Sequence, residues 1–291
     1  GEGLDFASVK LSSSSDPFSL TLAAASDNAI VVNPGTRYQT SWRSIEVISL
    51  TTGDGNDTLD LRGIHADASR LNRWGWDDLN PGQFWSSGAG DDSFAIDLGS
   101  VGQHRFWGGE GTDTLLLDWH LASSDIRRFR SDAGSNPSYT ISLGSSQSLT
   151  YNSVERFILT GGSGNDEFYA SGLENTLIGG AGNDRFYTAS TSAVLDGGEG
   201  LDYANISIAH ESRDFTLRLN DASHRSIVIN PGTSDQSVWR SIEVFDLSTG
   251  KGNDTVDLRG IEADAYGLNR DGWARLNTGN IWSAGCLLYT S

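Results

Sequence analysis

The sequence predicts an all-β protein made of many short strands, and three observations support this class. Eight glycine-rich turns that end in aspartate are spread along the 291 residues. The second residue after each aspartate is usually apolar, which favours a short strand with one side chain directed inward. Runs such as FSLTL and FTLRL alternate apolar and polar residues, and only the stretch 65–80 is a candidate for a short helix.

The turns share one pattern, with aspartate at the sixth position. The clearest copies are GGSGNDEFY (161–169), GGAGNDRFY (179–187) and GGEGLDYAN (197–205). Glycine permits the tightly folded backbone of such a turn. The aspartate supplies a hard oxygen ligand, and exposed turn carbonyls supply more.

This pattern resembles the nonapeptide repeat GGxGxDxUx of the RTX, or haemolysin-type, calcium-binding family. The resemblance implies a parallel β-roll, a β-solenoid whose half-coils are single nonapeptides, with Ca²⁺ bound between stacked turns. It implies ligands from the sixth-position carboxylates and from turn carbonyls. These residues are Asp5, Asp57, Asp92, Asp113, Asp166, Asp184, Asp202 and Asp254, with Gly162, Gly164, Gly180, Gly182, Gly198 and Gly200.

The spacing of the aspartates predicts where coils stack directly. The separations are 52, 35, 21, 53, 18, 18 and 52 residues, and 18 residues make two nonapeptides, or one full coil. Asp166, Asp184 and Asp202 are therefore expected to form one column along an edge of the roll. Asn175 and Ala193 hold the sixth position on the opposite edge, which is expected to bind calcium poorly. The wider separations predict strand-rich insertions, or coils without a ligand-bearing turn.

A longer duplication organises the chain. Residues 1–88 align without gaps on residues 198–285, with 51 identical pairs. The blocks are 1–107, then 108–197, which begins a weaker third copy, then 198–285; the cleanest coils span 161–205. The duplication predicts AGDD after Gly285, but CLLYTS follows, which matches a translated sequencing adapter, so 286–291 is interpreted as a non-native tail.

The charge of the chain fits cation binding. The net charge is −18, which disfavours nucleic acid as a partner. Carboxylates on turns ~4.8 Å apart repel by roughly 1 kcal/mol even in water. Because this repulsion accumulates along a stack, we expect folding to depend on calcium.

The absence of several sequence features predicts where the protein is located and that it is part of a larger chain. It has no methionine and opens inside a repeat, so we expect a segment of a larger protein. No apolar run is long enough to cross a membrane. Apart from Cys286 the chain is acidic and free of cysteine, and the resemblance implies export by type I secretion machinery to the cell surface or medium.

The function expected is a calcium-binding structural region of a secreted bacterial protein, with no catalytic residue. One alternative is an adhesin that binds extracellular polysaccharide through insertions rich in tryptophan. Another is the calcium module of a polysaccharide-acting enzyme, with the catalytic domain in flanking sequence. Glu46, Glu155 and Glu243, in SIEV-type motifs, are expected to orient the backbone or a bound ion at a turn edge. The tryptophans concerned are Trp74, Trp76, Trp85, Trp107, Trp273 and Trp282.

Overall fold

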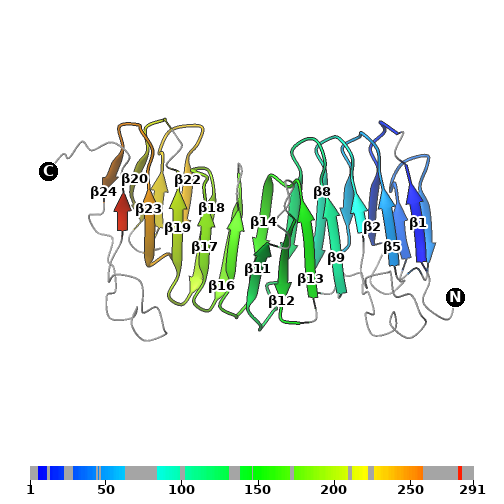
Figure 1. Ribbon diagram of the computed structural model, residues 1–291, viewed down its shortest axis with the longest axis horizontal. Coiled ribbons are helices and arrows are strands. Elements are labelled where there is room, and N and C mark those ends of the chain that lie inside the picture. Colours follow the sequence, from blue (N-terminus) through cyan, green and yellow to red (C-terminus); the bar gives the residue numbers. More distant parts are fainter. Residues whose placement is uncertain are drawn as a thin grey trace. The chain divides into compact units, whose positions relative to one another are not determined.

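The computed structural model describes residues 6–11, 14–22, 29–43, 45, 47–62, 84–98, 102–130, 138–145, 147–170, 174–208, 212–221, 226–257 and 281–283. All regular secondary structure in these ranges is β-strand and most strand pairs are parallel, which confirms the all-β class (Figure 1). No described segment is a helix that could span a membrane. The candidate helix at 65–80, the tail at 286–291 and Asp5 lie outside the described residues.

The chain divides into two compact units. Unit 1 comprises Gly1–Ala122 and Ile126–Ile158, and unit 2 comprises Ser123–Asp125 and Leu159–Ser291. The described strands of unit 1 are β1 (Phe6–Lys10), β2 (Ser19–Leu22), β3 (Ala29–Val32), β4 (Thr40–Arg43), β5 (Val47–Thr51), β6 (Thr58–Asp60), β7 (Phe84–Ser86), β8 (Ser93–Asp97), β9 (Gly102–Trp107), β10 (Thr114–Asp118), β11 (Ile126–Arg130), β12 (Tyr139–Leu143) and β13 (Gln147–Asn152). Strand β14 (Arg156–Thr160) follows.

From β5 to β10, successive strands of unit 1 alternate between two sheets. One sheet has the order β1-β5-β7-β9-β13-β12-β11, and the other contains β10-β8-β6-β2-β3-β4. Phe94 of β8 packs across to Phe106 of β9 and Trp85 of β7, with ring centroids 5.1 and 5.9 Å apart. All three rings are fully buried. The inward residues of both sheets therefore form one apolar core.

Unit 2 repeats the alternation with shorter coils. Its described strands are β15 (Glu167–Ala170), β16 (Thr176–Ala181), β17 (Arg185–Thr188), β18 (Val194–Glu199), β19 (Tyr203–Ser207), β20 (Thr216–Asp221), β21 (Ser226–Ile229), β22 (Ser237–Arg240), β23 (Val244–Ser248), β24 (Thr255–Asp257) and β25 (Ile281–Ser283). One sheet has the order β15-β17-β19-β23-β25, and the other contains β24-β20-β21-β22-β18-β16.

Strands of unit 2 pair in parallel with a register spacing of 18 residues, which is the spacing of the aspartates in the sequence. Phe168 pairs with Phe186, and Phe186 pairs with Ala204, in parallel. On the other sheet, Leu177 pairs with Leu195. The inward residues of one coil thus lie directly against those of the next, because the register advances by one full coil.

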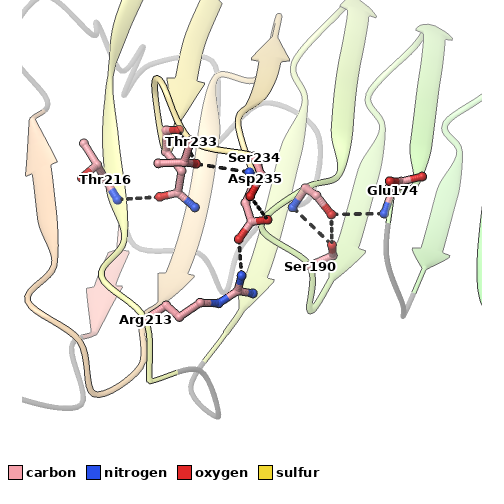
Figure 2. Close-up of polar contacts among 9 residues, drawn as sticks. Glu174, Ser190, Arg213, Thr216, Thr233, Ser234 and Asp235 are labelled. Carbon is pink, nitrogen blue, oxygen red and sulfur yellow. Dashed lines mark hydrogen bonds and ion pairs between the residues drawn. The ribbon is translucent and has the colours of Figure 1, made fainter.

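The predicted insertions are present as three-stranded antiparallel meanders. They are β2-β3-β4, β11-β12-β13 and β20-β21-β22. The first and third use the same turn, in which Asn33 and Asn230 adopt positive φ and accept the backbone N–H of Ser19 and Thr216. Figure 2 shows this turn in the third meander, with Thr233 in the turn and Thr216 of β20 beside it. The sequence duplication is thus also a duplication of local structure.

Candidate metal centre

The sixth-position aspartates of unit 2 are joined into a carboxylate column by hydrogen bonds between successive turns. The backbone N–H of Asp166 donates to Oδ1 of Asp184 at 2.7 Å, and that of Asp184 donates to Oδ1 of Asp202 at 2.8 Å. The N–H of Asp202 donates to Oε2 of Glu243 at 2.9 Å. We call these four residues the second column. The three aspartates are at most 1 % exposed.

Unit 1 holds a first column of the same construction. The backbone N–H of Asp57 donates to Oδ1 of Asp92 at 2.8 Å, and that of Asp92 donates to Oδ1 of Asp113 at 3.0 Å. The N–H of Asp113 donates to Oε2 of Glu155 at 2.9 Å. At the other end, Oδ1 of Asp57 accepts the N–H of Phe18 at 2.7 Å. Each column is therefore a finite stack that ends on a glutamate.

One carboxylate oxygen of most of these aspartates is buried without a hydrogen-bond donor. Oδ1 accepts a backbone N–H from a neighbouring segment of the stack, whereas Oδ2 accepts no hydrogen bond from any described residue. This holds for Asp57, Asp92, Asp113, Asp184, Asp202 and Asp254. Only Oδ2 of Asp166 receives a donor, the N–H of Gly162 at 3.2 Å. Keeping a carboxylate ionised and buried, with one oxygen lacking both a donor and a cation, costs roughly several kcal/mol of folding free energy.

The protonation equilibria reflect this cost. Burial raises the pKa of Asp184 to about 8, and the charges of its neighbours in the column add to the effect. Burial likewise raises the pKa of Asp113 and of Asp202 to about 7. It also raises the pKa of Asp57 and Asp92 above the ordinary value. Without a cation, these turns therefore disfavour the ionised carboxylates that calcium requires.

A backbone carbonyl lies near Oδ2 of the aspartate at each step of the second column, a step being the space between two successive turns. A Cβ added at Gly179 would lie within 3.0 Å of both Oδ2 of Asp184 and the carbonyl oxygen of Gly197. One added at Gly161 would meet Oδ2 of Asp166 and the carbonyl of Gly179 in the same way. Glycine at the first position of the turn therefore brings two acceptor oxygens together with no side chain between them.

These carbonyls differ from the ones that the sequence predicted. The prediction named glycines at the second and fourth positions, whereas Gly179 and Gly197 hold the first position. The carbonyl of Gly162 instead accepts the N–H of Ala181 at 2.7 Å. A Cβ at Gly180 or Gly182 would clash with the turn before it. Positive φ is found at Gly180, Gly182, Gly198 and Gly200, so these glycines shape the turn backbone.

The first column differs at the first position of two turns. Thr52 and Ser87 stand where the second column has glycine. The hydroxyl of Thr52 donates to the carbonyl of Ser87 at 2.9 Å, and the hydroxyl of Ser87 donates to the carbonyl of Gly108. At these two steps a side-chain hydroxyl therefore already donates to the carbonyl, whereas glycine has no side chain that could do so.

The remaining candidates are placed as follows. Oδ1 of Asp254 accepts the N–H of Phe215 at 3.1 Å, which repeats the contact between Phe18 and Asp57. Among the described residues, no three His, Cys, Asp or Glu side chains converge as a metal-binding group. Any ion held here would therefore depend on backbone carbonyls as well as on the carboxylates, as Ca²⁺ sites commonly do.

The opposite edge of these coils is built from neutral groups. Asn175 and Ala193 are both buried there. The backbone N–H of Glu174 donates to the hydroxyl of Ser192 at 3.1 Å, and that hydroxyl bonds to Ser190 at 3.1 Å (Figure 2). The charged edge and the neutral edge are thus stabilised by different chemistry.

Comparisons with protein-family models and with curated proteins give no relative of this chain. No protein-family model matches the chain. No curated protein matches it with significance.

Proposed function

We propose that this chain is a calcium-binding structural repeat region of a large secreted bacterial protein, and that its alternating coils form a parallel β-roll that folds when Ca²⁺ binds outside the cell. The observation that carries the proposal is the buried Oδ2 of Asp113, Asp184 and Asp202, which accepts no hydrogen bond from a described residue and lies near a backbone carbonyl oxygen of the next stacked segment. Two acceptor oxygens that face each other in a buried position favour a hard cation.

The residues that would hold the ion follow from this arrangement. At the step between the turns of Asp184 and Asp202, the ligands would include Oδ2 of Asp184 and the carbonyl of Gly197. At the step before it, Oδ2 of Asp166 and the carbonyl of Gly179 would serve. Bound calcium supplies the positive charge that these oxygens lack.

Coupling between binding and folding is the physical consequence. The column is assembled only when the turns stack, so an ion bound there favours the folded state over the unfolded one. Low calcium would leave the buried carboxylates uncompensated, and high calcium would offset them. This behaviour suits a protein that crosses a secretion channel unfolded and folds in the medium.

The polysaccharide-binding alternative finds little support among the described tryptophans. Trp85, Trp119 and Trp239 are buried, and Trp85 stacks on Phe106 with centroids 4.9 Å apart. Trp107 is partly buried and meets Phe84 edge-on at 5.4 Å. Core packing accounts for these rings. Trp74, Trp76 and Trp273 lie outside the described residues.

Circular dichroism of the full chain tests the proposal. We expect a weak β-sheet signal in EGTA, a strong one in millimolar Ca²⁺, and a smaller response to equal Mg²⁺, which prefers water and stricter geometry. A β-sheet signal that is equal in EGTA and in Ca²⁺, with no heat of calcium binding, would contradict the proposal.

A further inference from the structure

The last step of each column is built like the glycine steps of the second column, although the segment that completes it is not a glycine-rich turn. The first column ends at the segment Ser153–Glu155 and the second at Ser241–Glu243. In both, the glutamate lies two residues after the serine, whereas a column aspartate lies five residues after the first position of its turn. The sequence pattern of the nonapeptide therefore does not predict an ion at either place.

The oxygen atoms at these two steps nevertheless repeat the arrangement within the columns. A Cβ added at Gly108 would lie within 3.0 Å of both Oδ2 of Asp113 and the carbonyl oxygen of Ser153. One added at Gly197 would meet Oδ2 of Asp202 and the carbonyl of Ser241. Both Oδ2 atoms are buried and accept no hydrogen bond. Both aspartates are fully buried.

The glutamate takes the place of the next aspartate in the backbone contacts as well. Oε2 of Glu155 accepts the N–H of Asp113, and Oε2 of Glu243 accepts that of Asp202, each at 2.9 Å. The carbonyl of Asp113 accepts the N–H of Glu155 at 3.2 Å, and the carbonyl of Asp202 accepts that of Glu243 at 3.1 Å. The extra methylene lets a shorter turn present a carboxylate at the same place.

The two serines adopt the same unusual backbone. The φ angle is 50° at Ser153 and 49° at Ser241, in the left-handed region that residues other than glycine rarely adopt. These two related segments, one in each unit, thus share a conformation that places a carbonyl near an orphaned carboxylate oxygen.

From this geometry we infer that each column carries a further calcium site at its aspartate–glutamate step, formed by Asp113, Ser153 and Glu155 in unit 1 and by Asp202, Ser241 and Glu243 in unit 2. The inference rests on the proposed calcium function and extends it to segments outside the nonapeptide pattern. These sites would close each column with a bound ion where the chain returns from a three-stranded insertion.

Calcium stoichiometry of a double variant tests the inference. Glutamine at positions 155 and 243 keeps an oxygen that can accept the aspartate N–H but removes the charge. We expect Glu155→Gln/Glu243→Gln to bind two fewer Ca²⁺ per chain than the unaltered protein in equilibrium dialysis. Glu110→Gln/Glu199→Gln is the matched control, because both of those side chains are exposed on turns, and it should bind as many ions as the unaltered protein.

The outcomes separate the two proposals. Calcium binding by the unaltered chain, with equal stoichiometry and affinity in the double variant, would overturn this inference and leave the proposed function standing. No binding by the unaltered chain would overturn both. If the double variant does not fold, carbon-13 NMR of the glutamate carboxyls in the unaltered chain decides between the outcomes. We expect the Glu155 and Glu243 signals, assigned through the single variants, to shift when calcium is added. Unchanged signals would overturn the inference.

Discussion

At the scale of single residues, the first position of each turn decides what lies beside the aspartate. Glycine at 179 leaves Oδ2 of Asp184 and the next carbonyl facing each other. Serine at 87 places a hydroxyl donor on the corresponding carbonyl of Gly108. This hydroxyl hydrogen-bonds to a carbonyl oxygen that a cation could otherwise bind. Turns that share the sixth-position aspartate therefore need not bind calcium with equal affinity.

Replacing Asp184 should therefore weaken calcium binding more than replacing Asp92. Asp184 belongs to two steps with glycine at the first position, whereas Asp92 lies between steps with Thr52 and Ser87. We expect Asp184→Ala to lower affinity by about tenfold or more, which is about 1.4 kcal/mol, and Asp92→Ala by less. Titration calorimetry on both variants measures this, and the reverse order would refute it.

Ser87→Gly should raise calcium affinity by changing the first position of a turn in the first column. It removes the hydroxyl that donates to Gly108 and recreates the first position of the second column. We expect calcium affinity to rise in this variant. An unchanged titration would mean that the hydroxyl does not limit binding at this step.

At the scale of elements, the unit of construction is a coil of two strands and two turns. Thr176, the first residue of β16, pairs in register with Val194, the first residue of β18. The N–H of Val194 donates to the carbonyl of Asn175 at 2.8 Å. Residues 176–193 therefore form one removable coil, and the coils before and after it present matching edges. In arrays of this kind each repeat contacts only its neighbours.

Deleting residues 176–193 should shorten the array without destroying it. The Asp166 turn would then stack on the Asp202 turn, and we expect a calcium-dependent β-sheet signal with one fewer bound ion. Deleting only 176–184 removes half a coil and sends each later strand to the opposite sheet, so we expect loss of the calcium response. Circular dichroism and equilibrium dialysis on both deletions measure this; identical behaviour of the two would contradict a coil of 18 residues.

At the scale of the whole molecule, the high net negative charge and the buried columns act in the same direction. The chain carries −18 overall, and part of that charge is concentrated in aspartates from which water is excluded. Calcium and protons both reduce this charge, so either should favour the compact state.

Stability without calcium should fall as the pH rises. In the folded state the pKa of Asp184 is raised to about 8 and those of Asp113 and Asp202 to about 7, against 3.8 for an ordinary aspartate. Between about pH 4 and about pH 8 the folded state therefore binds more protons than the unfolded state. The contribution to stability is fully present below about pH 4 and is lost as the pH rises through about 7 to 8.

Thermal unfolding of metal-depleted protein checks this sign. We expect a higher midpoint at about pH 5.5 than at about pH 8. Saturating calcium should remove or reverse the difference, because calcium binds the ionised carboxylates. A midpoint that rises with pH in the metal-depleted protein would show that the column carboxyls do not control its stability.

The sequence by itself determined the all-β class, the coil of 18 residues and the stacking of Asp166, Asp184 and Asp202, because period and spacing are properties of the chain alone. It also pointed to Glu155 and Glu243 as turn-edge residues. Only the tertiary structure decided which carbonyls meet the aspartates and that the glutamates end the columns. Those contacts join residues up to 42 positions apart, and only the stacking of coils brings them together.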